Sequence, residues 1–298
     1  MGHAQDEEAL TGCTVILCRE GAVAGVDVRG GAPGTRETNL LDPVNVVEKV
    51  HGVLLAGGSA FGLDAASGVM QYLEEQKVGF ETGAAKVPIV PAAILYDLSV
   101  GRSDVRPDAA MGYRAAVAAS YLAPEEGNVG AGIGASVGKM RGMPYAMKAG
   151  IGTWSTKVHG VVIGGLVAVN AIGDVVDPNS GEMVAGLRSG STMTWMKTNR
   201  PRARVPSNTV IGVIATNARL TKAQATKVAQ MAQDGLARVI RPAHTMFDGD
   251  TIFALSTGER KADVSLVGAF AAEVLAEAIL RAVRMAAPAG GLAGLFKE

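Results

Sequence analysis

Glycine is the residue that most constrains the fold of this chain, because 39 of its 298 residues are glycine and only 4% are aromatic. Glycine permits tight turns and close approach between backbones, a pattern typical of strands and helices that alternate over a compact core. Short apolar runs that predict buried strands lie at residues 14–18, 23–28, 52–56, 161–169 and 251–255. Helical periodicity occurs at residues 61–75, 220–240 and 264–286. Because no repeat or low-complexity linker separates these segments, we expect one α/β domain over residues 1–298.

The charge balance argues against several classes of partner. The chain has 28 basic and 28 acidic residues, so neither nucleic acid nor an anionic membrane is an expected partner, and a small molecule is. The first ten residues are polar and acidic, and no uninterrupted apolar stretch approaches the roughly 18 residues that a membrane helix needs. Cys13 and Cys18 lack the spacing of a zinc site or a disulfide framework, so they are expected to be buried thiols. We therefore expect a cytoplasmic protein.

Three familiar motifs are nearly present, and each fails at a position that its chemistry requires. Residues 57–61 resemble the nucleophile elbow of serine hydrolases, but Phe61 replaces the glycine that permits the strained turn. Gly138-Lys139 resembles the end of a phosphate loop, but Met140 replaces the hydroxyl residue that binds magnesium. The glycine-rich residues 130–135 fit the loose dinucleotide pattern, yet they follow a polar turn and precede no suitably spaced acidic residue.

The remaining candidates for metal binding are weak. His3, His51, His159 and His244 do not have the spacing of metal ligands, so we interpret them as structural or exposed residues. Asp248 and Asp250 supply too few oxygen ligands for a calcium loop. We therefore expect neither a metal nor a cofactor.

The junction at residues 206–209 offers a different chemistry, because Thr209 opens the apolar run 210–215 after a turn-like segment. On its own, this pattern indicates only a threonine at the start of a strand. If the bond between Asn208 and Thr209 were cut, however, Thr209 would carry both a hydroxyl nucleophile and a free α-amine. An α-amine has a pKa near 8, so its neutral form can accept the hydroxyl proton. One residue would then hold both a nucleophile and its base.

Two further groups of charged residues have both a structural and a functional interpretation. Asp248-Gly249 is a turn signal and Asp250 a solvated loop end, but paired carboxylates can also hold an α-amine and tune its pKa. Residues 127–173 contain no acidic residue while including Lys139, so the local field is positive. Such a basic run is usually a solvated face, although one of its members can lie inside a pocket.

Several long segments in order resemble the family of DmpA-type aminopeptidases and nylon-oligomer hydrolases, from about residue 2 to residue 286. The segments that carry the resemblance are TGCTVILCREGAVAGVDVRGGAPGTRE, LLAGGSAFGLDAASGVM, VPAAILYDLSVG, GAGIGASVGK, SNTVIGVIATNARLTK and HTMFDGDTIFAL. Members resemble N-terminal-nucleophile hydrolases, in which a precursor cuts itself before a serine or threonine. The resemblance implies a four-layer αββα sandwich, cleaved into an α fragment of residues 1–208 and a β fragment of residues 209–298. It also implies a homotetramer or larger homo-oligomer.

The resemblance carries over to individual residues. It implies that the bond between Asn208 and Thr209 is the cleavage site and that Thr209 is the nucleophile. Lys139 matches the lysine that the nylon-hydrolase branch places beside the nucleophile. The other matching positions are the family asparagine Asn170, the active-site tyrosine Tyr96, and the aspartate pair Asp248 and Asp250.

These matches predict a self-processing amide hydrolase. Asn170 and Tyr96 are expected to donate hydrogen bonds to developing negative charge, a contribution of about 3 kcal/mol for each well-placed donor. Lys139 is expected either to lower the pKa of the α-amine or to position the chain before cleavage. Each of these residues also has a structural interpretation. Tyr96 can serve packing, Asn170 can cap a strand, and Lys139 can be a surface charge.

The combination of residues distinguishes the two branches of the family. The branch of DmpA and the β-peptidyl aminopeptidases has serine as nucleophile, with a serine and a glutamate in place of the two aspartates. Thr209 with Asp248 and Asp250 therefore favours a nylon-oligomer (6-aminohexanoate oligomer) hydrolase. One alternative is an aminopeptidase that acts on small peptides or amino-acid amides. An alternative from another class is an uncut protein that binds a nucleotide at the loop of residues 130–135.

Overall fold

A large sheet organises the chain in a computed structural model that describes residues 1–199 and 208–297. Residues 206 and 207 of the predicted turn lie outside the described residues. In spatial order, the strands of the sheet are β10 (Ile151–Val158), β11 (Val161–Asn170), β14 (Thr209–Ala218), β16 (Thr251–Arg260), β2 (Thr11–Val28), β4 (Lys49–Ala56), β7 (Ala92–Ile94) and β3 (Thr35–Arg36), with β1 (Gly2–Asp6) paired to β2. Neighbouring strands are antiparallel except for two parallel pairs, β14 with β16 and β4 with β7.

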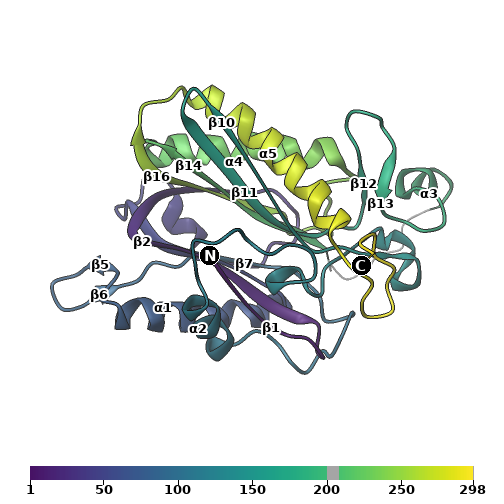
Figure 1. Ribbon diagram of the computed structural model, residues 1–298, viewed down its shortest axis with the longest axis horizontal. Coiled ribbons are helices and arrows are strands. Elements are labelled where there is room, and N and C mark those ends of the chain that lie inside the picture. The colour runs from purple at the N-terminus through teal and green to yellow at the C-terminus, as the bar shows by residue number, and fades with distance from the viewer. Residues whose placement is uncertain (200–207, 298) are drawn as a thin grey trace.

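Two pairs of helices cover the two outer sides of this folded sheet, as Figure 1 shows. One pair is α4 (Lys222–Val239) and α5 (Val264–Arg284), and the other is α1 (Ala65–Glu75) and α2 (Ala109–Val117). The short α3 (Thr192–Thr198) lies apart from both pairs (Figure 1). Two-residue and three-residue strands form the smaller sheets: β13 (Met183–Ala185) with β12 (Asp174–Val176) and β15 (Ile240–Arg241), β5 (Phe80–Glu81) with β6 (Lys86–Val87), and β8 (Ser136–Val137) with β9 (Met147–Lys148).

The buried side chains form three separate cores, and these define four layers. Successive strand residues point to opposite faces. In β11, Val167 and Val169 therefore pack with α4 and α5, whereas Leu166 and Ala168 pack in the middle core. Val53 and Leu55 of β4 lie in the same middle core, while Leu54 and Ala56 pack with α1 and α2. The sheet thus doubles back on itself around the middle core, and the expected αββα sandwich is confirmed.

Strand β2 joins the two sheet layers. Residues 14–18 and 23–28 were expected to be two short strands, but they belong to one strand of 18 residues. Its first part pairs with β4 and its last part with β16, with a register shift between Leu17 and Ala22. Such an irregularity bends a strand and increases its twist, which allows one strand to serve both layers.

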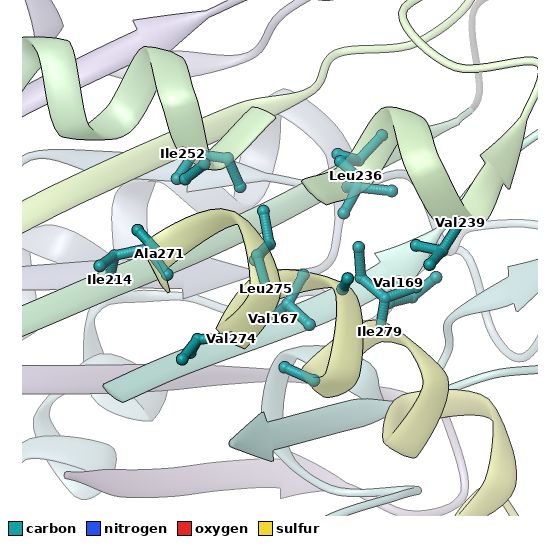
Figure 2. Packing of buried hydrophobic residues seen from close by; sticks show 14 of the residues in the cluster. Val167, Val169, Ile214, Leu236, Val239, Ile252, Ala271, Val274, Leu275 and Ile279 are labelled. Carbon is teal, nitrogen blue, oxygen red and sulfur yellow. The ribbon is translucent and has the colours of Figure 1, made fainter. Parts of the chain in front are cut away.

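The core between helices α4 and α5 and the strands β11, β14 and β16 consists of aliphatic side chains. Figure 2 shows Leu275 and Ile279 of α5 against Val167 and Val169 of β11, with Leu236 of α4 close by. Helix α4 begins with a capping box, in which Thr221 and Gln224 each accept a hydrogen bond from the other's backbone N–H. Asp263 caps α5 by accepting from the Leu266 N–H at 2.9 Å.

Glycine allows the other helix pair to approach closely. A Cβ atom on Gly68 of α1 would lie 1.7 Å from the carbonyl oxygen of Ala109, and one on Gly112 of α2 would lie 1.8 Å from that of Ala65. Neither position can accept a larger residue without separating the helices. No helix in residues 1–199 and 208–297 is both long and apolar enough to cross a membrane.

Candidate active site

Three distant segments of the chain meet where β11 ends and β14 begins. The antiparallel register of these strands pairs Asn170, the last residue of β11, with Thr209, the first residue of β14. A parallel β-bridge pairs Asn208 with Asp248, just before β16. Thr209 and Asn208 are each only 4% exposed. The predicted cleavage junction is therefore buried at one end of the sheet.

The carbonyl group of Asn208 is held by two donors. Its oxygen accepts a hydrogen bond from the backbone N–H of Gly249 at 2.9 Å and another from the hydroxyl of Thr209. The side chain of Asn208 adds an anchor, because its Nδ2 donates to the carbonyl oxygen of Phe247 at 3.2 Å. A backbone N–H at this position stabilises negative charge on the carbonyl oxygen if the hydroxyl attacks the carbonyl carbon.

Hydrogen bonds at both ends fix the side-chain amide of Asn170. Its Oδ1 accepts from the Lys139 ammonium at 2.7 Å and from the backbone N–H of Ser136 at 3.1 Å, while its Nδ2 donates to the carbonyl oxygen of Tyr96 at 2.9 Å. Tyr96 therefore contacts this cluster through its backbone carbonyl. With no exposed surface of its own, Asn170 presents a fixed dipole beside Thr209.

Lys139 is a buried lysine rather than a surface charge. Its side chain donates to both oxygens of Asn170, to the backbone carbonyl at 3.0 Å and to Oδ1 at 2.7 Å. Burial lowers the pKa of the Lys139 ammonium to about 7, an effect that the negative charges of Asp248 and Asp97 partly offset. Near neutral pH, Lys139 can therefore exist in substantial amounts as a neutral amine, which is able to accept a proton.

The two aspartates make different contacts. Asp250 accepts from the Val210 N–H at 2.8 Å through Oδ1, and from the N–H and Nδ1 of His244 at 3.1 Å and 2.8 Å through Oδ2. Asp248 accepts from the backbone N–H of Thr245 at 2.8 Å and from its hydroxyl. Burial and, secondly, the charge of Asp250 raise the pKa of the Asp248 carboxyl to about 6. Asp250 thus fixes the start of β14, and Asp248 changes protonation near pH 6.

The structure adds residues that the sequence did not single out. The sequence predicts a structural or exposed role for His244, and in the structure its ring lies against Asp250 with Nε2 buried. Ser136 orients Asn170, and Gly249 donates to Asn208. The position of Gly249 between two aspartates could have indicated its role, but Asp248-Gly249 is also the pattern of a turn. No local pattern indicates the role of Ser136.

The glycine-rich loop of residues 130–135 does not resemble an anion-binding loop. The N–H of Gly130 donates to Gln5 at 2.6 Å, and that of Ala131 donates to the hydroxyl of Thr14 at 3.0 Å. The N–H groups of Gly132, Ile133 and Ala135 donate to carbonyl oxygens within the same turn. These donors are therefore already used, which argues against the alternative of a nucleotide site here.

The contact between Gly249 and Thr209 yields a first prediction. A Cβ atom at position 249 would lie 2.9 Å from the Thr209 hydroxyl oxygen and 2.7 Å from the carbonyl oxygen of Ala32, so Gly249→Ala must displace one of them. We expect this variant to cleave at the junction about 100-fold more slowly, because small displacements of reacting groups cost rate steeply. Gly164→Ala is the control, since its Cβ would meet only the Ser155 Cβ at 3.9 Å. Cleavage is followed on denaturing gels, and equal rates in both variants would contradict this role.

Comparison with known sequences identifies relatives over nearly the whole chain. Residues 1–296 match peptidase family S58. The chain is 44% identical to an uncharacterised aminopeptidase of Mycobacterium tuberculosis, over 94% of this chain and 88% of the relative. It is 32% identical to a 6-aminohexanoate-oligomer endohydrolase of Paenarthrobacter ureafaciens, over 95% of this chain and 83% of the relative.

Solved structures share the fold. A β-aminopeptidase of a Burkholderia species superposes with a TM-score of 0.70 at 21% identity, covering 99% of this chain and 93% of that one. An L-aminopeptidase D-Ala-esterase/amidase of Ochrobactrum anthropi, described as a variant of the Ntn hydrolase fold, gives a TM-score of 0.70 at 17% identity. It covers 100% of this chain and 93% of the other. The Ntn hydrolase fold implied by the sequence resemblance is confirmed.

Proposed function

This chain belongs to peptidase family S58 and is a hydrolase of peptide or amide bonds, and from that premise we propose that it matures by cleaving itself between Asn208 and Thr209. The observation that carries the proposal is the buried Asn208 carbonyl, held by the Gly249 N–H and the Thr209 hydroxyl. A hydroxyl nucleophile and a hydrogen-bond donor therefore meet at one carbonyl group, as attack by Oγ and stabilisation of the oxyanion require.

Maturation proceeds in two chemical steps. The Thr209 Oγ attacks the carbonyl carbon of Asn208, its proton passes to the neutral amine of Lys139, and the Gly249 N–H stabilises the oxyanion. The carbon–nitrogen bond to Thr209 then breaks as the Lys139 ammonium returns the proton to the departing nitrogen, which leaves an ester on Oγ, a free α-amine and a neutral Lys139. Water hydrolyses the ester, so that Asn208 ends the α fragment and Thr209 begins the β fragment.

The mature site repeats this chemistry on a substrate amide. The α-amine of Thr209 takes the hydroxyl proton while Oγ attacks the substrate carbonyl. The α-ammonium then gives that proton to the leaving amine as the carbon–nitrogen bond breaks, and water hydrolyses the acyl-enzyme that remains. Asp250 holds the start of β14 through the Val210 N–H, one residue beyond the nucleophile. Asp248 and Lys139 set the charge around the amine.

The proposed substrate is a linear oligoamide of the 6-aminohexanoate type. Thr209 with the aspartate pair supports this choice, as does the similarity to 6-aminohexanoate-oligomer endohydrolases at 31–32% identity. A second candidate is an aminopeptidase, which is favoured by the relatives at 44% identity that carry that name. Assembly as a homo-oligomer and location in the cytoplasm stay predictions.

An assay on two substrate classes separates the candidates. Purified mature protein is incubated with linear 6-aminohexanoate oligomers and, in parallel, with p-nitroanilides of amino acids. We expect cleavage of the oligomers, including internal bonds, to dominate. Hydrolysis of the p-nitroanilides alone would instead establish the aminopeptidase. Inactivity on both, in a protein that has cut itself, would exclude both substrate classes while leaving self-cleavage in place.

A further inference from the structure

A second buried lysine, Lys148 of β9, takes no part in the proposed chemistry. Its side chain has no exposed surface, and its Nζ donates to the carbonyl oxygens of Gly132 at 3.2 Å, Ala135 at 3.0 Å and Ala149. Lys148 is also the strand partner of Ser136 across β8 and β9. These contacts close a loop of residues 132–148, called here the Lys148 loop. The loop places the Ser136 N–H against the Oδ1 of Asn170.

A buried carboxylate, Asp97, holds the other side of the same amide. Asp97 is 2% exposed and follows Tyr96, whose carbonyl oxygen accepts the Asn170 Nδ2. Its Oδ1 accepts from the Gly58 N–H at 2.7 Å, and its Oδ2 accepts from the Thr11 hydroxyl at 2.7 Å. These two bonds tie the segment after β7 to β2 and to the turn after β4.

Asp97 and the Lys148 loop are in direct contact. A Cβ atom on Gly134 would lie only 2.6 Å from the Cβ of Asp97, so the loop packs closely on this side chain. Asp97 and Lys148 also act on each other, and Asp97 acts on Lys139 as well. Burial lowers the pKa of both lysines, and the charge of Asp97 opposes this effect. Burial raises the pKa of Asp97, while its hydrogen bonds from Gly58 and Thr11 and, to a smaller extent, the charge of Lys148 lower it.

Burial of this kind is not explained by stability alone. Removing a lysine and a carboxylate from water costs free energy, and apolar residues of similar volume often serve a core equally well or better. Both charges nevertheless adjoin groups that hold the Asn170 amide. Lys148 pairs with Ser136, whose N–H donates to Asn170, and Asp97 follows Tyr96, whose carbonyl oxygen accepts from it. A geometric role accounts for this placement.

We propose that Lys148 and Asp97 are positioning residues that hold the Ser136 N–H and the Tyr96 carbonyl at the spacing that orients Asn170 beside Thr209 and Lys139. This inference rests on the proposed self-cleavage. Neither residue touches the reacting atoms, and both act through Asn170. Loss of either is expected to slow the reaction in a chain that still folds.

The chain contains a matched control for Lys148. Lys222 is also buried, at 3% exposure, and its Nζ also donates to backbone carbonyl oxygens, those of Leu40 at 3.1 Å and Asn45 at 2.8 Å. Lys222 lies at the start of α4, and its Nζ partners, Leu40 and Asn45, are not among the residues that hold Asn170. Lys148→Met and Lys222→Met therefore remove the same chemistry from two places.

The first experiment follows self-cleavage of the full chain by intact-mass measurement, with thermal unfolding as the test of folding. We expect Lys148→Met to slow cleavage on the order of 100-fold, the loss that a displacement of about 1 Å can cause, and Lys222→Met to cleave like the wild type. Similar rates in the two variants would overturn the proposal. A wild-type chain that never cleaves would instead refute the self-cleavage on which it rests.

A gentler pair of variants covers the case in which Lys148→Met fails to fold. Thr11→Val keeps the shape of a buried side chain but removes the donor to Asp97, whereas Thr11→Ser keeps the donor. We expect Thr11→Val to slow cleavage about tenfold, the effect of one lost hydrogen bond to a charged group, and Thr11→Ser to restore the wild-type rate. A merely structural role would not give this rescue. Equal cleavage in Thr11→Val and wild type would contradict the positioning role of Asp97.

Discussion

Replacing Thr209 by alanine is expected to leave a single chain of 298 residues that hydrolyses no amide. The substitution removes the hydroxyl that contacts the Asn208 carbonyl, and without it no ester can form at the junction. The backbone is unchanged, and Thr209 pairs with Asn170 through main-chain register, so the strand is expected to persist. The effect is therefore on chemistry and not on folding.

Intact-mass measurement and N-terminal sequencing check this result. The wild type is expected to yield two fragments, residues 1–208 and 209–298, with the second beginning at Thr209. Thr209→Ser is the matched control, because it retains a hydroxyl and is expected to cleave. Cleavage of Thr209→Ala at the same bond, or a wild type that stays whole, would falsify self-processing by this residue.

Replacing Lys139 by methionine is expected to slow self-cleavage by about 100-fold to 10,000-fold, the range typical of losing a general base. Before the cut, Thr209 has no free α-amine, so another group must accept the hydroxyl proton. Lys139 is buried, is bonded to Asn170, and has a pKa lowered to about 7. Methionine fills a similar volume but accepts no proton. Lys157→Met is the control, since Lys157 is exposed on β10.

The pH dependence of wild-type cleavage gives an independent check of the same role. Below pH 7, Lys139 is mostly protonated and cannot act as a base; above pH 7 it is mostly neutral. The rate is therefore expected to rise through about pH 7 and to level off above it. Asp248, with its pKa raised to about 6, ionises just below the pH at which Lys139 loses its proton. Its ionisation therefore affects the rising part of the pH–rate curve. A rate that does not change between pH 5 and pH 9 would exclude Lys139 as the base.

The elements were largely predictable from local pattern. Periodicity placed helices at residues 220–240 and 264–286, where the structure has α4 (Lys222–Val239) and α5 (Val264–Arg284). Such patterns depend on which residues face the core, and that is visible in a short window. The continuity of β2 was not predictable, because its two halves pair with strands far apart in the sequence. Resemblance, and not periodicity, indicated the four layers.

The sequence by itself determined which chemical groups are available: a threonine after Asn208, an amide at Asn170, a lysine at position 139 and an aspartate pair around Gly249. Only the tertiary structure decided what these groups do. It buries Lys139 and so lowers its pKa, gives Asp248 and Asp250 different partners, and aims the Gly249 N–H at the Asn208 carbonyl. Desolvation and hydrogen bonding depend on distances between segments that are remote in the chain, and no local pattern encodes those distances.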